Sequence, residues 1–364
     1  MNQQTPQETP LFYIKDRPIH SRVMLAPMAG VTDVVFRALV RHWAPSSLIC
    51  TEMISSNGMI YSKQRKARIL DHTESDHPIA YQLAGHRHAV LIEAAQQVIE
   101  DHDPTTIDLN MGCPVKKITG NFEGCALMKE PQMAADMVRA LIAEIDRPVT
   151  IKCRLGWDFD TVNYLDFGKR MEEAGASMIT LHARTRSQGY QPGVQWEAFG
   201  RLKQALSIPV TANGDINTLE DAETVLNDYG VDAVMIGRGC QGKPWLIGHI
   251  DHALKTGQHL PAFTLEEKLK VAMDHTLHLC DYRGFKVGMK EIRKHLAWYV
   301  EGFRGARTFR HQLTNVSTLE EVEQIFEDIL AASAEDGLEN LGTEALDTEK
   351  LDTHPGDDRY AVAV

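Results

Sequence analysis

The chain has 364 residues, of which 43% are hydrophobic and 24% charged, and its formal net charge is −12. This composition is typical of a soluble globular protein, and no apolar run reaches the ~18 residues that a membrane-spanning helix needs. The polar start of the chain is unlike a secretory signal. Six cysteines without a C-x-x-C pair favour free thiols in a reducing, cytoplasmic setting over a disulfide framework.

Near-continuous apolar runs recur along the chain, as expected for parallel strands that are covered on both faces, and amphipathic segments separate them. The runs predict strands at 23–28, 47–53, 79–84, 106–111, 149–154, 178–183, 209–214 and 232–237. The segments between them predict helices at 33–43, 88–100, 131–145, 162–174, 196–205 and 219–228. This alternation predicts an α/β fold, a (β/α)8 TIM barrel, ahead of an open doubly wound sheet.

After Pro261 the alternation stops, and Thr264 with Glu267 forms a capping-box pattern that starts a helix. The remaining periodic segments predict helices at 264–282, 289–301 and 319–330. We therefore predict four regions: a flexible N-terminus over 1–20, a barrel over 21–258, a small helical domain over 259–332 and an acidic disordered tail over 333–364.

Charge is distributed unevenly along the chain. The tail over 333–364 holds nine acids and two bases, so it carries −7 of the net charge and reads as a solvated extension. The segment 283–311 holds eight bases and two acids, a net +6. Two interpretations of this segment stay open: a solvated helix face, or a surface that contacts phosphates.

Cys113 stands between Gly112 and Pro114, where the predicted strand 106–111 ends. Pro cannot continue a sheet ladder, so the thiol should lie on a turn at the carboxyl end of a strand, where barrels carry their chemistry. Lys116 and Lys117 follow closely and would favour a thiolate. The residues alone leave three roles open: packing, nucleophile or acid.

Other polar side chains also fall at predicted strand ends. A lysine within an apolar strand, as Lys152 is, is costly unless it meets an anion or a polar ligand. Gln82 ends the third strand, and His182 and Arg184 end the sixth. Because the carboxyl ends of barrel strands meet at one mouth, we expect these side chains to lie together.

Two glycine-bearing turns, 212–215 and 235–239, follow the last two strands. Such turns often bind phosphate through backbone N–H groups, so they predict a phosphorylated cofactor or substrate. The run 237–242 matches G-x-G-x-x-G, but no strand follows it, which excludes a dinucleotide fold. We find no zinc pattern and no G-x-S-x-G motif.

Together these motifs resemble those of the tRNA-dihydrouridine synthases. The resemblance rests on L-A-P-M-A-G-V-T-D from Leu25, N-M-G-C-P-V-K-K from Asn110, Lys152, H-A-R-T-R from His182, A-N-G-D from Ala212 and M-I-G-R-G from Met235. The run R-K-H-L-A-W-Y from Arg293 resembles the bacterial B-type branch of the family. One departure is Cys125, where that branch usually has serine.

The resemblance implies an FMN-bearing barrel, a helical tRNA-binding domain and Cys113 as the catalytic general acid. It assigns the flavin to Pro27, Met28, Ala29, Gln82, Lys152, His182, Asn213, Gly214, Asp215, Gly237 and Arg238. It assigns substrate contacts to Asn110, Arg184, Arg293, Lys294 and His295.

The reaction implied is the reduction of a D-loop uridine of tRNA to 5,6-dihydrouridine, at position 17 by analogy with the B-type branch. NADPH or NADH would reduce FMN, hydride would pass to carbon 6 of uracil, and Cys113 would protonate carbon 5. Neither a metal nor a membrane partner is expected. The alternatives are an FMN-dependent barrel reductase of a small molecule, and a non-catalytic tRNA-binding protein.

Overall fold

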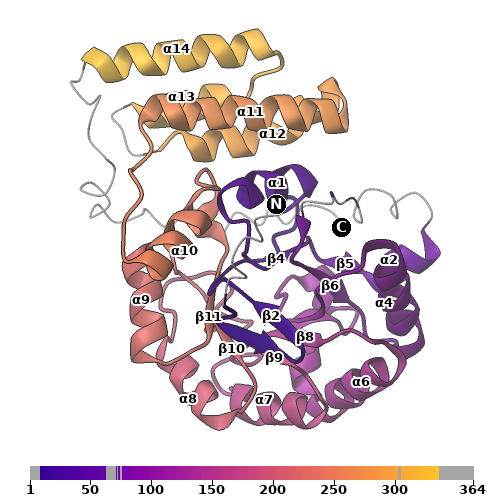
Figure 1. Cartoon of the computed structure of the whole chain (residues 1–364). Helices are drawn as coiled ribbons and strands as arrows, with labels where there is room; N and C mark the ends of the chain where they lie inside the picture. Colours follow the sequence, from indigo (N-terminus) through magenta and orange to yellow (C-terminus); the bar gives the residue numbers. More distant parts are fainter. Residues whose placement is uncertain (1–8, 63–70, 72, 74–75, 302–304, 336–364) are drawn as a thin grey trace, which may run out of the picture. The chain divides into compact units, whose positions relative to one another are not determined.

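The computed structural model of the chain describes residues 9–62, 71, 73, 76–301 and 305–335. The chain divides into two compact units, and the boundary between them falls between Gly239 and Cys240. The first unit is an α/β barrel and the second is helical (Figure 1). The division precedes helix α10 (Leu246–Thr256), whereas the sequence analysis placed it after residue 258.

The expected (β/α)8 TIM barrel is confirmed: within the described residues, eight parallel strands form a closed sheet. Its members in order are β3 (Val23–Leu25), β4 (Ile49–Cys50), β6 (Ile79–Ala84), β7 (Thr106–Met111), β8 (Val149–Arg154), β9 (Met178–His182), β10 (Val210–Asn213) and β11 (Ala233–Ile236). The pairing of β11 with β3 and of β4 with β6 closes the ring. Of the predicted strand 47–53 only Ile49–Cys50 pairs in the ring, and β5 (Ile54–Ser55), beyond its predicted end, pairs further along β6.

Helices surround the barrel and connect its strands (Figure 1). They are α1 (Val34–Trp43), α2 (Ser56–Tyr61), α4 (His88–His102), α5 (Lys116–Thr119), α6 (Pro131–Glu144), α7 (Tyr164–Glu173), α8 (Glu197–Ala205) and α9 (Leu219–Asp228). Their buried faces pack against strands that are buried on both sides, as the continuous apolar runs predicted.

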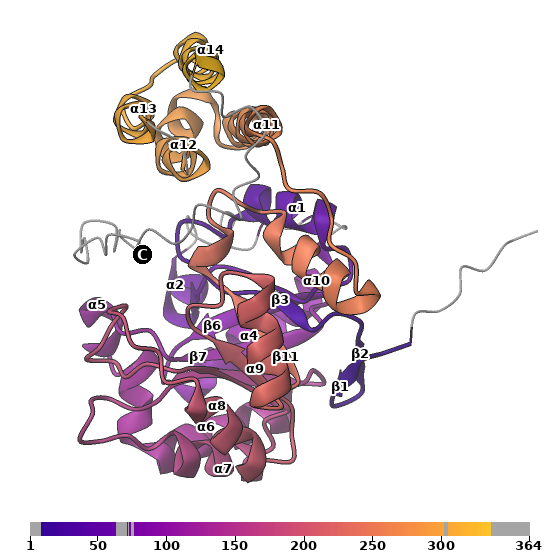
Figure 2. The same cartoon turned by 90° about the vertical axis from the view of Figure 1, so that its left-hand side faces the viewer.

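A β-hairpin corrects the prediction of a flexible N-terminus over 1–20. Strands β1 (Phe12–Ile14) and β2 (Arg17–Ile19) pair antiparallel, and Ile14 and Ile19 are fully buried against the amino ends of the barrel strands. Figure 2 shows this hairpin at one end of the barrel and α5, which follows β7, at the opposite end. The burial of Ile14 and Ile19 in this apolar cluster explains why the segment folds as a hairpin. Residues 1–8 lie outside the described residues.

The second unit is helical, as predicted. It contains α10, α11 (Leu265–Arg283), α12 (Phe285–Tyr299), α13 (Ala306–Leu313) and α14 (Leu319–Glu335). The predicted capping box is present: the Thr264 side chain accepts from the Glu267 backbone, and the Glu267 carboxylate accepts from the Thr264 backbone. Helix α13 was not predicted, and α14 continues into the first residues of the predicted tail; the rest of that tail lies outside the described residues.

The hairpin gives a test of how the barrel is closed. We expect Ile14→Ala to lower the free energy of unfolding by ~2–5 kcal/mol, because truncating a buried aliphatic side chain leaves a cavity. The matched control is Tyr13→Ala on the same strand, whose side chain is 53% exposed and should matter little. Urea unfolding measures both. Equal effects of the two variants would contradict the assignment of the hairpin to the barrel core.

Candidate active site

The register of the barrel strands brings the predicted polar residues to one mouth. Gln82 lies opposite Asp108, Asn110 lies opposite Lys152, and His182 lies opposite Asn213 on neighbouring strands. Met28, after β3, lies close to Gly237 after β11, since a Cβ added to Gly237 would be 3.9 Å from Met28 Sδ. The barrel residues predicted from the resemblance therefore belong to adjacent strand ends, as the parallel sheet requires.

A buried carboxylate that the sequence analysis missed organises this mouth. Asp108 is only 2% exposed, and it accepts hydrogen bonds from Thr150 Oγ1 at 2.6 Å and from Gln82 Nε2 at 2.7 Å. Gln82 Oε1 in turn accepts from Asn110 Nδ2 at 2.7 Å. Burial raises the pKa of Asp108 to about 6, although these hydrogen bonds and Lys152 act in the opposite direction.

The signal for Asp108 is present in the sequence. Side chains alternate between the two faces of a strand, so Thr106, Asp108 and Asn110 share one face of β7. Three polar residues on one face of an otherwise apolar strand indicate a polar lining of the barrel.

Lys152 lies beside this network on β8. Its Nζ donates to Asn213 Oδ1 at 2.9 Å, and Asn213 Nδ2 donates to the Met235 carbonyl at 2.7 Å. Burial lowers the pKa of Lys152 to about 8; Arg154 lowers it further and Asp108 opposes the shift. A buried ammonium of this kind suits a polar or anionic ligand group.

His182 is held as a neutral imidazole. Burial lowers its pKa well below the ordinary value, and the neighbouring cations Arg154, Lys152, Arg184 and Arg238 lower it further. A neutral ring offers both a hydrogen-bond donor and an acceptor to a ligand.

The turn that carries Cys113 is held by several hydrogen bonds. Asn110 Oδ1 accepts from the backbone N–H groups of Gly112 at 3.2 Å and Cys113 at 2.9 Å. Arg154 Nε donates to the Gly112 carbonyl at 2.8 Å, and the Cys125 N–H donates to the Cys113 carbonyl at 3.1 Å. The backbone around the thiol is therefore fixed from the strand side and from the loop side.

The electrostatics of the turn separate the two chemical roles left open for Cys113. Burial raises the pKa of the thiol above its ordinary value, and the partly compensating charges are those of Arg154 and Lys152, not of Lys116 or Lys117. A thiol with a raised pKa is protonated at neutral pH, which suits a proton donor better than a nucleophile. Cys125 is fully buried, with a pKa raised by burial to about 12, and packs near Met128.

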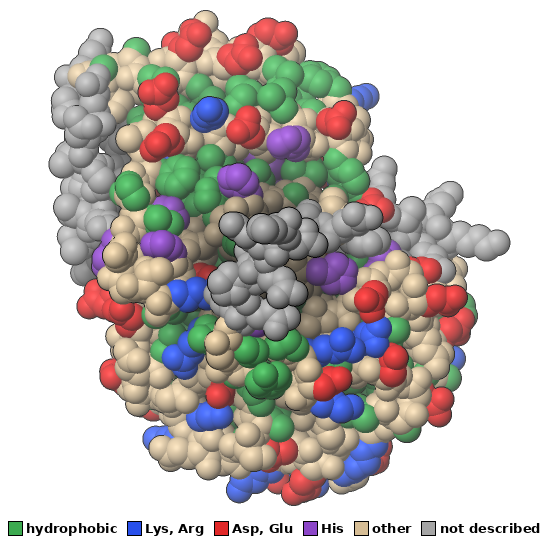
Figure 3. All heavy atoms as spheres, viewed as in Figure 1, with side chains coloured by type: hydrophobic (Ala, Val, Ile, Leu, Met, Phe, Trp, Pro, Cys, Tyr) green, Lys and Arg blue, Asp and Glu red, His purple; other side chains and the backbone are tan. Residues whose placement is uncertain are grey.

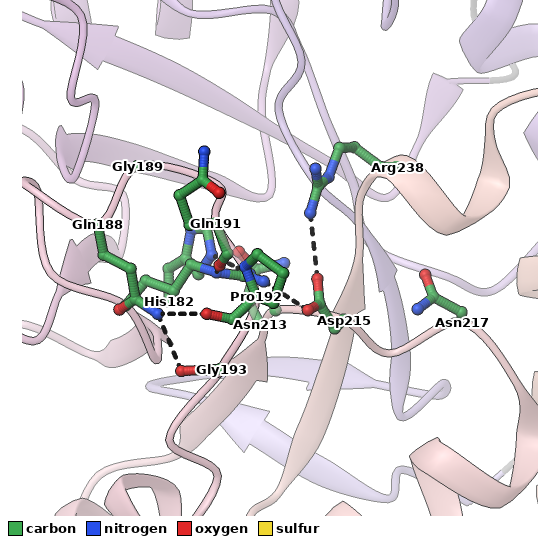
Figure 4. A network of polar contacts seen from close by, with 12 residues as sticks. His182, Gln188, Gly189, Gln191, Pro192, Gly193, Asn213, Asp215, Asn217 and Arg238 are labelled. Carbon is green, nitrogen blue, oxygen red and sulfur yellow. Dashed lines mark hydrogen bonds and ion pairs between the residues drawn. The ribbon is translucent and has the colours of Figure 1, made fainter. Parts of the chain in front are cut away.

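Asp215, in the turn after β10, lies between two guanidinium groups. One of them belongs to Arg238, in the turn after β11, and Figure 4 shows it pointing toward the Asp215 carboxylate. Arg238 Nη2 is 3.1 Å from Asp215 Oδ1, and Arg184 Nη2 pairs with Asp215 Oδ2 at 2.5 Å. Gly214 has a positive φ of 123°, a conformation that favours glycine. Through Asp215 the exposed side chain of Arg238 thus connects the turn after β11 to the turn after β10.

Arg184 is buried within this network, although the sequence analysis expected it to contact tRNA. Its side chain is 1% exposed, its Nε donates to the Gln191 carbonyl at 2.6 Å, and its Nη1 is 3.3 Å from His182 Nε2. Arg184 therefore ties the loop after β9 to the site, and its contact with tRNA stays a prediction.

The other predicted substrate contacts belong to the second unit. Arg293 Nε donates to the Val316 carbonyl at 2.7 Å, and the buried His295 ring packs edge-on against His275 at 4.7 Å between centroids. Lys294 lies between them on α12. The side of this unit seen in Figure 3 presents mainly apolar and acidic side chains, so that side is not a basic surface. The predicted role of these three residues is untested.

The described residues contain no cluster of three or more His, Cys, Asp or Glu side chains arranged to hold a metal ion. No helix in the described parts of the chain is long and apolar enough to cross a membrane.

Comparison with known proteins agrees with the motifs. The Dihydrouridine synthase (Dus) family matches residues 24–335. The probable tRNA-dihydrouridine synthase 1 of Synechocystis sp. is 41% identical over 315 residues, which cover 86% of this chain and 88% of that protein. The tRNA-dihydrouridine synthase B of Pseudomonas aeruginosa is 40% identical over 296 residues, which cover 81% and 89%. The chain therefore belongs to the dihydrouridine synthase family.

Proposed function

We propose that the protein uses FMN and NADPH or NADH to reduce one D-loop uridine of tRNA to 5,6-dihydrouridine, in the cytoplasm. Family membership supports the reaction class, and resemblance to the B-type branch supports position 17. The observation that carries the chemistry is Cys113, a protonated thiol on a turn fixed at the mouth of the barrel.

The residues at the mouth fit FMN by the chemistry of their donors. The Lys152 ammonium, the Gln82 and Asn213 amides and the neutral His182 ring can bind the polar edge of a flavin ring. The turns at Gly214 and Gly237, with Arg238, can hold its phosphate. When bound, FMN supplies the hydride that saturates the carbon 5–carbon 6 bond of uracil.

Cys113 then completes the reaction as the general acid. Hydride addition at carbon 6 leaves negative charge delocalised over carbon 5 and the carbonyl group, and the Cys113 thiol gives its proton to carbon 5. The raised pKa means that the thiolate readily recovers a proton from water, so the acid is regenerated for the next turnover. Asn110, whose amide is already oriented by Gln82, is the predicted contact of the uracil edge.

The substrate must leave its stack to reach this mouth. Unstacking a base costs a few kcal/mol, which contacts elsewhere on the RNA have to offset. The helical unit, whose segment 283–311 has a net charge of +6, is the proposed source of those phosphate contacts.

The acid role of Cys113 can be tested by substitution. Cys113→Ala should retain FMN and its reduction by NADPH but lower the rate of dihydrouridine formation by ~10²–10⁴-fold, the usual contribution of a general acid. Mass spectrometry of tRNA from single-turnover reactions measures the product, and mapping its position tests the assignment to residue 17 of the tRNA. Cys125→Ser is the matched control, because its hydroxyl could donate to the nearby Gly156 carbonyl. Full activity of Cys113→Ala would rule out the acid role.

The role of Lys152 gives a pH-dependent test. Its charged form prevails below its pKa of about 8, so FMN affinity should fall as the pH rises through and above that value. Lys152→Met should weaken FMN binding about tenfold or more and remove most of this pH dependence, because a hydrogen bond to a charged group contributes ~1.5–3 kcal/mol.

Quenching of flavin fluorescence on titration with protein stripped of flavin measures this affinity. Lys169→Met, at an exposed position on α7, is the control and should leave the profile unchanged. A wild-type profile that is flat between pH 7 and 10 would contradict the assignment of Lys152 to the flavin.

A further inference from the structure

One buried carboxylate near the site has no part in the chemistry described so far. Glu123 is 3% exposed and lies between α5 and the short helix η2 (Gly124–Lys129). Asn57 Nδ2, on α2, donates to Glu123 Oε1 at 3.4 Å, and His86 Nδ1 lies 3.9 Å from the same oxygen. Glu123 thus joins the Cys113 loop to helix α2, which follows β5, and to the turn after β6.

The residues after Glu123 touch the backbone of Cys113. Gly124 has a φ of 61°, and a Cβ added there would lie 2.8 Å from the Cys113 carbonyl oxygen and 3.0 Å from Cys113 Cβ. The next residue, Cys125, donates its N–H to that same carbonyl. Any displacement of Glu123 is therefore passed directly to the turn that carries the thiol.

The two segments that carry the partners of Glu123 pack closely against each other. A Cβ added to Gly85 would lie 2.2 Å from Ser56 Oγ, so the turn after β6 and the first turn of α2 are in very close contact. Asn57 and His86 are the next residues along these two segments. Cys113 itself packs against the apolar cluster of Met53, Ala84 and Ile118. Beyond the hydrogen bonds of the Cys113 turn itself, the loop thus has an apolar contact with this cluster and a polar attachment through Glu123.

We propose that Glu123 is a positioning residue for the reaction: through Asn57 and His86 it holds the loop 113–125 so that the Cys113 thiol keeps its place at the barrel mouth. This inference rests on the proposed function, in which Cys113 is the acid. A catalytic group must be held within ~0.5 Å of its working position, and a loop needs such supporting contacts to do so.

The attachment depends on charge. His86, in the turn after β6, is the titratable group that faces Glu123, while the contact from α2 is the neutral Asn57 amide. Burial raises the pKa of Glu123, and His86 and Asn57 act against that shift. The attraction between Glu123 and His86 needs the ionised carboxyl, and burial favours its neutral form, so the attachment weakens as the pH falls.

The test uses FMN-loaded full-length protein and three variants, Glu123→Ala, Glu123→Gln and the control Glu130→Ala. Glu130 is exposed and its side chain makes no cap hydrogen bond, so it matches the charge change without the attachment. The first readout is the rate at which iodoacetamide alkylates Cys113, followed by mass spectrometry of the peptide that contains it. The other five cysteines are buried and should react little. The second is the single-turnover rate of tRNA reduction, measured with the KM for tRNA.

In Glu123→Ala we expect iodoacetamide to alkylate Cys113 severalfold faster than in the wild type. The same variant should reduce tRNA up to about 10²-fold more slowly with the KM for tRNA unchanged, because misplacing a catalytic group lowers the rate of the chemical step. Glu123→Gln keeps an acceptor for Asn57 and should fall between the wild type and Glu123→Ala. It also preserves side-chain size, so it still tests the proposal if Glu123→Ala does not fold. Glu130→Ala should behave as wild type in both readouts.

Unchanged alkylation and unchanged reduction in both Glu123 variants would overturn the proposal, as would an equal loss in Glu130→Ala. The alkylation rate reports the placement of the thiol whether or not Cys113 is the acid. If Cys113→Ala keeps full activity, the proposed function fails while this readout still decides the role of Glu123.

Discussion

The buried carboxylate of Asp108 sets the direction of the hydrogen bonds at the barrel mouth. An ionised carboxylate only accepts, so the Gln82 amide must turn its NH2 group toward Asp108 and its oxygen toward Asn110. Asn110 then donates to Gln82, which leaves its oxygen to accept from the backbone N–H groups of Gly112 and Cys113. One charge inside the barrel thereby orients two amides and the turn that carries the thiol.

The same mouth concentrates positive charge, although the chain as a whole is acidic. Burial keeps His182 neutral, and the cations Arg154, Lys152, Arg184 and Arg238 reinforce this effect. Asp108 and Asp215 offset part of this charge, and the remainder suits a cofactor phosphate and an RNA backbone. Local charge, and not the net value of −12, is therefore the relevant quantity for the proposed ligands.

The barrel was predictable because parallel strands covered on both faces are apolar throughout. The strands 79–84, 106–111 and 149–154 match β6, β7 and β8 at both ends. The hairpin β1–β2 escaped prediction because its strands are short and its turn, Lys15–Asp16, lacks glycine although Lys15 has a φ of 57°. Helix α13 escaped because, over its 8 residues, few side chains are buried.

At the site, strand ends identified Cys113, Gln82, Lys152 and His182, but not what orients them. Asp108 lies within a strand, where the alternation of Thr106, Asp108 and Asn110 is its signal in the sequence, but its partners come from β6 and β8. Glu123 becomes notable only when α2 and the turn after β6 are brought beside it. Residue type and order predict which groups act, whereas the contacts that position them arise from segments far apart in the chain.

The most direct test of the account is the titration of the Cys113 thiol. The rate of Cys113 carbamidomethylation, followed by peptide mass spectrometry between pH 6 and 11, reports the fraction of thiolate in the FMN-loaded protein. Because burial outweighs the nearby cations, we predict an inflection at a higher pH than that of a free cysteine measured with the same reagent. An inflection below pH 8 would mean that the thiolate prevails at the mouth of the barrel, which would contradict a protonated Cys113 as the proton donor.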